Sequence, residues 1–314
     1  MRAPLAWLLF TACVGGSTPS GTAVPTDSAP ETATTADPAY VAAVNLWHAD
    51  RVAALKAPDG WLSLAGLFWL EEDGLHEVGS DADDPIRLPR ASVDTGILRK
   101  AGANVTFTPS ASALVTLNGQ PVVGSVDLRA DSHEKGPTKL EHNGVTFYLV
   151  QRADRYGIRV KDPKAEARTN FAGIPRYPVD PSLKVMAKLT PHDSEVTLTL
   201  PSVIGTTSEE PSPGLLSFTL NGQEHWLHPV MSGNGLFIVF GDQTNGPESY
   251  GGGRFLTAKA ADADGNVELD FNKAINPPCA FTPYATCPLP PTENKLAVRI
   301  PAGERNVEGA HPHE

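Results

Sequence analysis

The chain has 314 residues, of which 40% are hydrophobic, and its formal net charge is −11. This length allows one large domain or two of ordinary size, and the hydrophobic content is sufficient for a buried core. Surfaces that bind nucleic acid are built from clustered Lys and Arg, and the sequence has no basic stripe. We therefore expect no nucleic acid partner.

The first residues have the layout of a secretory signal. Arg2 precedes a short apolar run that is too short to span a bilayer and that ends in small residues and Cys13. Phe10-Thr11-Ala12-Cys13 resembles the bacterial lipobox, with Phe10 where Leu is usual. We expect a signal peptide at 1–12, lipidation of Cys13, and a location in the bacterial cell envelope, periplasmic or at the cell surface, with the lipid as the only membrane anchor. The alternative is a plain secretory signal with an incidental cysteine.

The next segment, 13–37, is nearly all Gly, Ser, Thr, Ala and Pro and is predicted to be a disordered tether. Asp37-Pro38 is a typical helix start, with an acidic N-cap and a proline in the first turn. Apolar and long side chains then recur at helical spacing, which predicts one amphipathic helix that ends at Pro58-Asp59-Gly60. The residues of this face are Tyr40, Val44, Trp47, Arg51 and Leu55.

From Gly74 onward, short alternating segments lie between turn residues, which is typical of antiparallel strands. Asn-Gly turns at 118–119, 143–144 and 221–222 indicate hairpins. We predict a mainly β protein with sandwich or barrel-like antiparallel sheets: a helix plus small sandwich at 38–128, and a larger body at 139–304. In that body we expect strands at 183–189, 195–200, 236–240 and 295–300, and a connection without strand at 205–213.

The two late cysteines, Cys279 and Cys287, are predicted to form a disulfide, because two thiols outside the cytoplasm usually pair. Closing this loop of nine residues contributes about 2.5 kcal/mol in the chain-entropy model. A metal site and a catalytic thiol are the alternatives. The cysteine spacing matches no common zinc motif, so we expect no metal and no cofactor.

The segment from Tyr250 to Pro291 is the predicted site, because glycines, prolines and single polar residues concentrate there. Glycines 251–253 followed by Arg254 form a plausible anion clamp. A hairpin turn at 264–266 would pair the strand of Arg254 with the strand of Asp270, bringing Arg254, Asp270, Asn272 and the cysteine loop together. A functional site of this kind predicts little loss of stability in Arg254→Ala.

The candidate ligand-binding residues are therefore those of this segment together with one arginine from an earlier cluster. That cluster, Arg152, Arg155 and Arg159, is either a solvated face or a second anion-binding patch. Asp270 and Asp242 are the candidate catalytic acids or bases. The ligand-binding candidates are Tyr250, Arg254, Asp270, Asn272, Asn276 and Arg159.

Several catalytic signatures are absent from the sequence, namely the GxSxG elbow, the phosphate-binding loop, HExxH and GxGxxG. Three function classes stay open. The first is an envelope lipoprotein that binds a small anionic ligand or a peptide. The second is a hydrolase-like enzyme with a carboxylate beside Arg254. The third is a structural protein without a ligand.

Several motifs, among them GWLSLAGLFWLEEDG, RYGIRVKD, YGGGRFL and NPPCAFTPYATCPLPP, resemble the bacterial and archaeal family known as domain of unknown function 1684. The resemblance covers about residues 40–304 and implies that the cysteine loop belongs to the family pattern. It implies no activity. Separately, GLHEVGSDADDPIRLP followed by LNGQPV resembles the opening strands of a forkhead-associated β-sandwich. Ser80 stands where the phosphate-holding arginine is expected, which argues against phosphothreonine binding.

Overall fold

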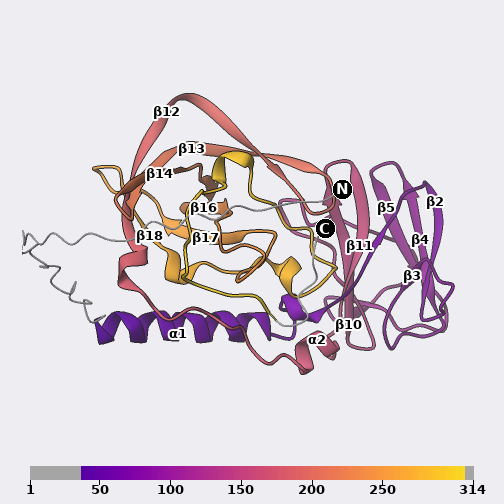
Figure 1. Cartoon of the computed structure of the whole chain (residues 1–314). Coiled ribbons are helices and arrows are strands. Elements are labelled where there is room, and N and C mark those ends of the chain that lie inside the picture. Colours follow the sequence, from indigo (N-terminus) through magenta and orange to yellow (C-terminus); the bar gives the residue numbers. More distant parts are fainter. Residues whose placement is uncertain (1–36, 308–314) are drawn as a thin grey trace, which may run out of the picture. The chain divides into compact units, whose positions relative to one another are not determined.

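The computed structural model describes residues 37–307 (Figure 1). The predicted signal peptide, the lipidation of Cys13 and nearly all of the tether lie outside the described residues. The described chain is mainly β, with antiparallel sheets and one long helix near its start, as predicted. None of the helices in the described part is both long and apolar enough to cross a membrane.

Helix α1 (Pro38–Leu55) starts and ends where the sequence predicts. The Asp37 carboxylate caps it by accepting a hydrogen bond from the Ala39 amide at 2.9 Å. The predicted face is the buried one, since Val44 and Leu55 are fully covered. A single helical turn, α2 (Glu166–Thr169), follows much later in the chain.

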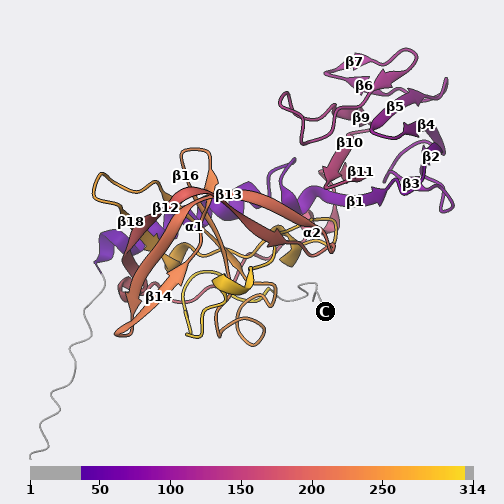
Figure 2. The same ribbon diagram turned by 90° about the horizontal axis from the view of Figure 1, so that it is seen from above.

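Two sheets form a sandwich between residues 64 and 161, and Figure 2 shows their strands gathered together. The first, in spatial order, is β1 (Leu64–Trp69), β11 (Arg155–Lys161), β10 (Val145–Arg152), β9 (Leu140–His142), β6 (Thr116–Leu117) and β7 (Gln120–Pro121). The second is β3 (Ile86–Arg87), β2 (Gly74–Gly79), β4 (Asp94–Ala101), β5 (Asn104–Pro109) and β8 (Val126–Asp127). Phe107 and Phe147 meet edge to face in the shared core.

This sandwich is larger than the one we predicted. Strands β9 to β11, which we assigned to the body that begins at residue 139, pair with β6 and β1. The predicted boundary between 128 and 139 therefore lies inside the sandwich. Sequence alternation identifies a strand but does not identify its partner, and β1 and β11 are far apart in the chain.

The later strands form two further sheets over a second core. One sheet is β14 (Gln223–Leu227), β13 (Thr207–Leu220), β12 (Lys184–Pro201) and β18 (Asn266–Asp270). The other is β15 (Val230–Ser232), β16 (Gly235–Phe240) and β17 (Arg254–Lys259). Strand β16 is central, as its uninterrupted apolar sequence predicts.

Two strand predictions in this region were wrong. Segments 183–189 and 195–200 are one long strand, β12, with an irregular register between Pro191 and Val196. Its partner β13 runs through 207–213, where we predicted a connection without strand. That part of β13 pairs only with β12, so Pro211 and Pro213 lie where a missing N–H removes no bond to a second neighbour.

The predicted last strand at 295–300 is also absent. Lys295 makes a single bridge to Gly241, and the following residues are irregular. The segment still pairs with the loop after β16 through its backbone, since the Leu296 amide donates to the Gly241 carbonyl and the Gln243 amide donates to the Val298 carbonyl. At Ile300 side chains take over: its amide donates to the Asp242 carboxylate, and its carbonyl accepts from Arg254. The backbone groups are thus satisfied by loop residues 241–243 and by two side chains, without a regular strand.

Candidate ligand-binding site

Arg254 lies at the start of β17 and is completely buried. Its guanidinium donates to the Asp242 carboxylate at 2.8 Å and to the carbonyls of Ile300 and Ala302. Asp242 also accepts from the Thr244 amide and hydroxyl and from the Ile300 amide. The pair therefore joins β17, the loop after β16 and the C-terminal segment, and its hydrogen-bonding capacity is largely filled by protein groups.

Asp270 and Asn272 belong to a second, separate cluster beneath α1. The Tyr40 hydroxyl donates to Asp270 at 2.7 Å, and the Asn272 amide side chain donates to the Tyr40 hydroxyl at 3.0 Å. Burial and the Asp270 carboxylate raise the pKa of Tyr40, which keeps the hydroxyl protonated. Lys273 completes the cluster as an ion pair with Asp270 at 3.1 Å. These contacts fix the helix on the strands.

The predicted convergence of Arg254 with Asp270 is not found, because the two strands do not form a hairpin ladder. β17 pairs with β16, whereas β18 crosses to the other sheet and pairs with β12. The turn at 262–266 exists, but the chain leaves it toward β12: the Leu189 amide donates to the Gly265 carbonyl at 2.8 Å. The predicted alternation on β18 is correct, with Val267 and Leu269 buried.

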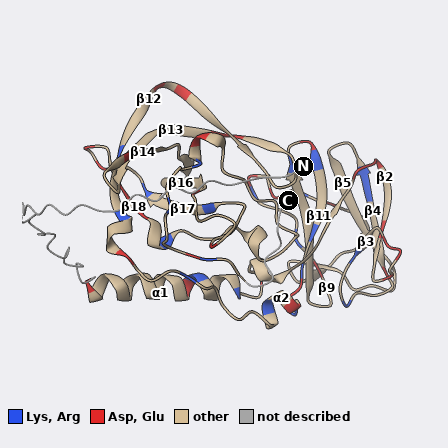
Figure 3. Cartoon of the chain, viewed as in Figure 1, with Lys and Arg blue, Asp and Glu red and all other residues tan. Residues whose placement is uncertain are grey.

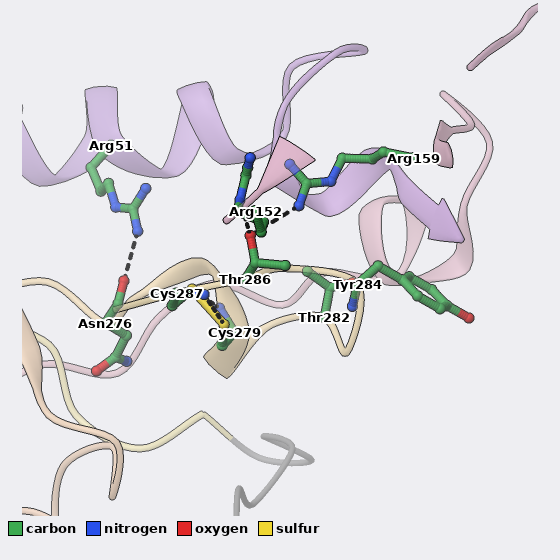
Figure 4. The surroundings of a disulfide bond; sticks show 9 residues. All are labelled: Arg51, Arg152, Arg159, Asn276, Cys279, Thr282, Tyr284, Thr286 and Cys287. Carbon is green, nitrogen blue, oxygen red and sulfur yellow. Dashed lines mark hydrogen bonds between the residues drawn. A yellow bond between two sulfur atoms is a disulfide. The ribbon is translucent and has the colours of Figure 1, made fainter. Parts of the chain in front are cut away.

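Asn276 is buried beside Glu304, a residue that the sequence reasoning did not identify. The Asn276 amide N–H donates to the Glu304 carboxylate at 2.6 Å, and the Asn276 carbonyl accepts from Arg51 of α1 at 3.1 Å (Figure 4). Glu304 is 1% exposed, and burial raises its pKa to about 7, although Arg51 at 3.4 Å acts in the opposite direction. Burial is the largest contribution, and the Arg51 charge and the Asn276 amide offset it only in part.

Cys279 and Cys287 are joined by the predicted disulfide (Figure 4). Each cysteine amide donates to the sulfur of the other, at 3.1 and 3.2 Å, so the loop closes with its own backbone donors satisfied. After the disulfide the chain pairs with the end of β12: the Val203 amide donates to the Cys287 carbonyl, and the Leu289 amide donates to the Pro201 carbonyl.

The predicted glycine cluster lies beside the end of this loop and lines a cavity of about 680 Å³. Residues 250–253 form a turn closed by the Gly253 amide and the Tyr250 carbonyl at 3.1 Å. Gly253 has a φ of 83°, and a Cβ there would lie 2.3 Å from Pro290. Burial raises the pKa of Tyr250 to about 12. The cavity wall contains Ser202, Val203, Gly205, Gly241, Asp242, Gln243, Asn245, Gly251, Gly252, Gly253, Leu289, Pro290, Lys295 and Leu296.

The electrostatic character of this glycine-turn cavity is set by Lys295. The charge of Asp242 is balanced by Arg254, and Lys295 forms no ion pair with any described residue. The amides of Gly251 and Gly252 donate no hydrogen bond within 37–307, so they stay available to a ligand. An ammonium group and two free amides suit an anion, while Val203, Leu289 and Leu296 suit an apolar body.

Arg159 is the remaining predicted ligand-binding residue, and it lies elsewhere, on β11. It is 3% exposed and donates to the Thr286 hydroxyl at 3.3 Å. Of its neighbours in the predicted arginine patch, Arg155 pairs with Glu71 and covers the Trp69 ring, and Arg152 pairs with Asp131. The three arginines are therefore not one solvated face.

A larger cavity of about 780 Å³ lies between α1, α2 and the cysteine loop. Its wall is mostly apolar, with His48, Glu166 and Asn170 as the polar members that can carry charge or donate. Burial lowers the pKa of His48, which keeps the imidazole neutral near pH 7. This cavity was not predicted. Among residues 37–307 there is also no cluster of His, Cys, Asp and Glu suited to a metal ion.

Lys295, Thr286 and Glu304 are the potentially functional residues that the sequence reasoning missed. A lone Lys in a polar segment has no sequence signal, and Thr286 owes its importance to arginines about 130 positions earlier. Glu304 had a weak signal, because it ends the family-like motif PAGE.

The comparisons with known proteins identify a family but no activity. The family described as "Protein of unknown function (DUF1684)" matches residues 169–305. No curated protein matches. A solution NMR structure of an uncharacterized protein from Haloarcula marismortui is 33% identical over 44% of this chain and 78% of that chain, with a TM-score of 0.38. The forkhead-associated resemblance of the N-terminal part stays a prediction. The chain belongs to the family of proteins of unknown function DUF1684.

Proposed function

We propose that this protein is an envelope lipoprotein that binds a small carboxylate with an apolar body in the glycine-turn cavity. The observation that supports the proposal is Lys295, an exposed cation that has no counter-ion among the described residues and that lines a cavity of about 680 Å³ with two free amides. This volume lies in the usual range for small-ligand sites. From the sequence we predicted Arg254 as the cation that binds the ligand. In the structure Arg254 forms an ion pair with Asp242, so Lys295 takes that role in the proposed site.

The ligand carboxylate accepts hydrogen bonds from the amides of Gly251 and Gly252 and pairs with Lys295. Its hydrocarbon part lies against Val203, Leu289 and Leu296. Pro290 stiffens the wall and lies close to Gly253, so little ordering of the protein is needed when the ligand enters. A peptide with a free C-terminal carboxylate has the same chemistry.

The hydrolase alternative has less support. A general acid or base must be within reach of the substrate. Asp242 accepts from Arg254, Thr244 and Ile300, and Asp270 is occupied by Tyr40, Asn272 and Lys273. The oxygens of both carboxylates are therefore already engaged by protein groups, and neither carboxylate is placed to exchange a proton with a substrate.

Titration calorimetry with octanoate tests the site. We expect saturable binding to the parent protein and at least tenfold weaker binding to Lys295→Gln, about the effect of one charge-assisted contact. Lys259→Gln is the matched control, an exposed lysine on β17 outside the cavity. Equal affinities of the two variants would refute the assignment of Lys295.

The lipoprotein part of the proposal rests on the sequence around Cys13 alone. Expressed in a bacterium with labelled fatty acid, the protein is expected to take up label and to enter the detergent phase. Cys13→Ser is expected to do neither. A parent protein that is exported, unlabelled and soluble would favour the plain secretory signal instead.

A further inference from the structure

Arg159 is a buried cation that has no carboxylate partner in the part of the chain that the structure describes. It lies on β11 opposite Tyr148 of β10, and its side chain is 3% exposed. It forms no ion pair with any described residue, and its Nε has no hydrogen-bond partner within 37–307. A buried charge normally has a counter-ion, because removing a charge from water is unfavourable. Burial accordingly lowers the pKa of Arg159.

The second feature is the Thr286 hydroxyl, which lies next to Cys287 in the disulfide loop. Its oxygen accepts from Arg152 Nε at 2.8 Å and from an Arg159 terminal nitrogen at 3.3 Å (Figure 4). A hydroxyl oxygen has two lone pairs and one proton. Both acceptor positions are filled by guanidinium groups, and the proton has no acceptor among the described residues. The hydroxyl is therefore a polarised donor.

The charges around Thr286 leave one positive charge in excess. Arg152 is balanced by Asp131 at 2.9 Å, with a second bond at 3.1 Å. Arg159 adds a second positive charge, and it forms no ion pair with Asp131 or with any other described residue. Figure 3 shows basic and acidic residues interspersed along the elements in view. A single negative charge would complete the cluster.

A cavity of about 420 Å³ opens beside this cluster, and Arg152 and Thr286 are part of its wall. Most of its other polar groups are hydroxyls from the turn between β12 and β13, the start of β13 and the end of β15: Ser202, Thr206, Thr207, Ser208 and Ser232. Ser202 and Thr206 share a hydrogen bond at 2.9 Å. Glu210 is the one acid in this wall. Arg159 itself lies behind Thr286 and does not line the cavity.

We propose that this hydroxyl-lined cavity is a second binding site, next to the glycine-turn cavity with which it shares Ser202, and that it takes a sugar bearing a carboxylate. The carboxylate accepts the Thr286 hydroxyl proton in the field of Arg152 and Arg159. The hydroxyls of the wall exchange hydrogen bonds with the sugar hydroxyls, which act as both donors and acceptors.

The charge balance selects a carboxylate over a phosphate. One excess positive charge matches a monoanion, whereas a phosphate monoester carries a charge of nearly two at neutral pH. Glu210 also lines the cavity, and it repels a doubly charged ligand more strongly than a singly charged one. A neutral sugar offers the Thr286 hydroxyl a weaker hydrogen-bond acceptor, and it does not balance the positive charge of Arg159. We therefore expect it to bind more weakly than a sugar carboxylate.

Titration calorimetry with glucuronate, glucose and glucose 6-phosphate on the full chain tests the proposal. We expect saturable binding of glucuronate, with glucose at least tenfold weaker and glucose 6-phosphate weaker than glucuronate. Arg159→Met and Thr286→Val are each expected to weaken glucuronate binding at least tenfold. Arg155→Met is the matched control on the same strand, because Arg155 pairs with Glu71 outside the cavity, and it is expected to bind like the parent.

Thermal unfolding keeps the test decisive if one variant is difficult to prepare. Without ligand, Arg159→Met is expected to melt no lower than the parent, because it removes an uncompensated buried charge. With glucuronate, the parent is expected to melt higher than the variant. Equal binding of glucose and glucuronate, or unchanged glucuronate affinity in both Arg159→Met and Thr286→Val, would overturn the proposal. Lys295→Gln is expected to leave glucuronate binding unchanged, so this site and the glycine-turn cavity can fail independently.

Discussion

The sharpest prediction concerns Glu304, whose carboxylate is buried between Arg51 of α1 and Asn276. We expect Glu304→Gln to remove a pH dependence of stability that the parent protein has. Gln has nearly the same shape and can still accept the Asn276 amide hydrogen bond, so the substitution changes the charge and little else.

The sign follows from the direction of the shift. The pKa of Glu304 rises from 4.5 to about 7 on folding, so between these values the folded state binds the proton and the unfolded state does not. The stability that the protonated form contributes is complete below about pH 4.5 and is lost as the pH rises through about 7. A shift of this size corresponds to about 3 kcal/mol, because each pKa unit is about 1.4 kcal/mol.

Urea unfolding of the unlipidated Cys13→Ser protein, followed by tryptophan fluorescence from pH 4.5 to 8.5, measures this difference. The free energy of unfolding of Glu304→Gln minus that of the parent is expected to increase by about 3 kcal/mol across the range. Comparing the two curves cancels the contributions of His48 and His228, whose pKa values burial lowers in both proteins. Parallel curves would show that Glu304 titrates normally, and a difference of opposite sign would show that the Arg51 ion pair outweighs burial.

Three further predictions follow from the contacts of the candidate site. Arg254→Met is expected to destabilise the protein by about 3–5 kcal/mol in urea unfolding, because Asp242 stays buried without its partner; the double variant with Asp242→Asn should lose less than the sum, and additive losses would mean that the pair is not coupled. This reverses the small effect that the sequence suggested. Replacing Cys279 and Cys287 by serine is expected to lower the free energy of unfolding by about 2.5 kcal/mol, and reduction of the parent should reproduce the loss. Gly253→Ala is expected to lower the melting temperature, because Gly253 has a φ of 83° and a Cβ placed on it would lie 2.3 Å from Pro290. Gly251→Ala should have little effect, because a Cβ there would lie 3.9 Å from its nearest neighbour.

Local features of the fold could be predicted because they depend on a few neighbouring residues. The Asp37 cap sets the start of α1, and each predicted Asn-Gly turn has both residues at positive φ, for example 49° and 75° at Asn143 and Gly144. The alternation of Val267 and Leu269 likewise gives the buried face of β18.

Strand partners could not be predicted in the same way, because pairing is decided by burial in the whole fold. The turn before β18 looks like a hairpin turn, yet β18 pairs with β12 at Val185 and Leu269. Leu269 and Phe271 then enter the core between the two sheets, beside Phe218 and Phe240. A ladder with β17 would have satisfied the same backbone groups, so the sequence around the turn does not distinguish the two arrangements.

The assignment of Arg254 to a ligand shows what limits site prediction from isolated residues. Arg254 shares the parity of Leu256 and Ala258 on β17, and both pack against the core. An arginine that faces the core needs a nearby acid to balance its charge. Phe240 pairs with Arg254 across the strands, and Asp242 comes two residues after Phe240. The alternation of β17 is thus consistent with a structural ion pair at Arg254 in place of a ligand site. Phe255 on the other face of the strand is buried as well, however, so the alternation did not identify which face lies toward the core. Lys295 became visible only when the wall of the glycine-turn cavity was known, because several exposed lysines likewise form no ion pair with a described residue. Arg159 became visible only when burial and the complete set of ion pairs were known, because it is a buried charge with no carboxylate partner among the described residues.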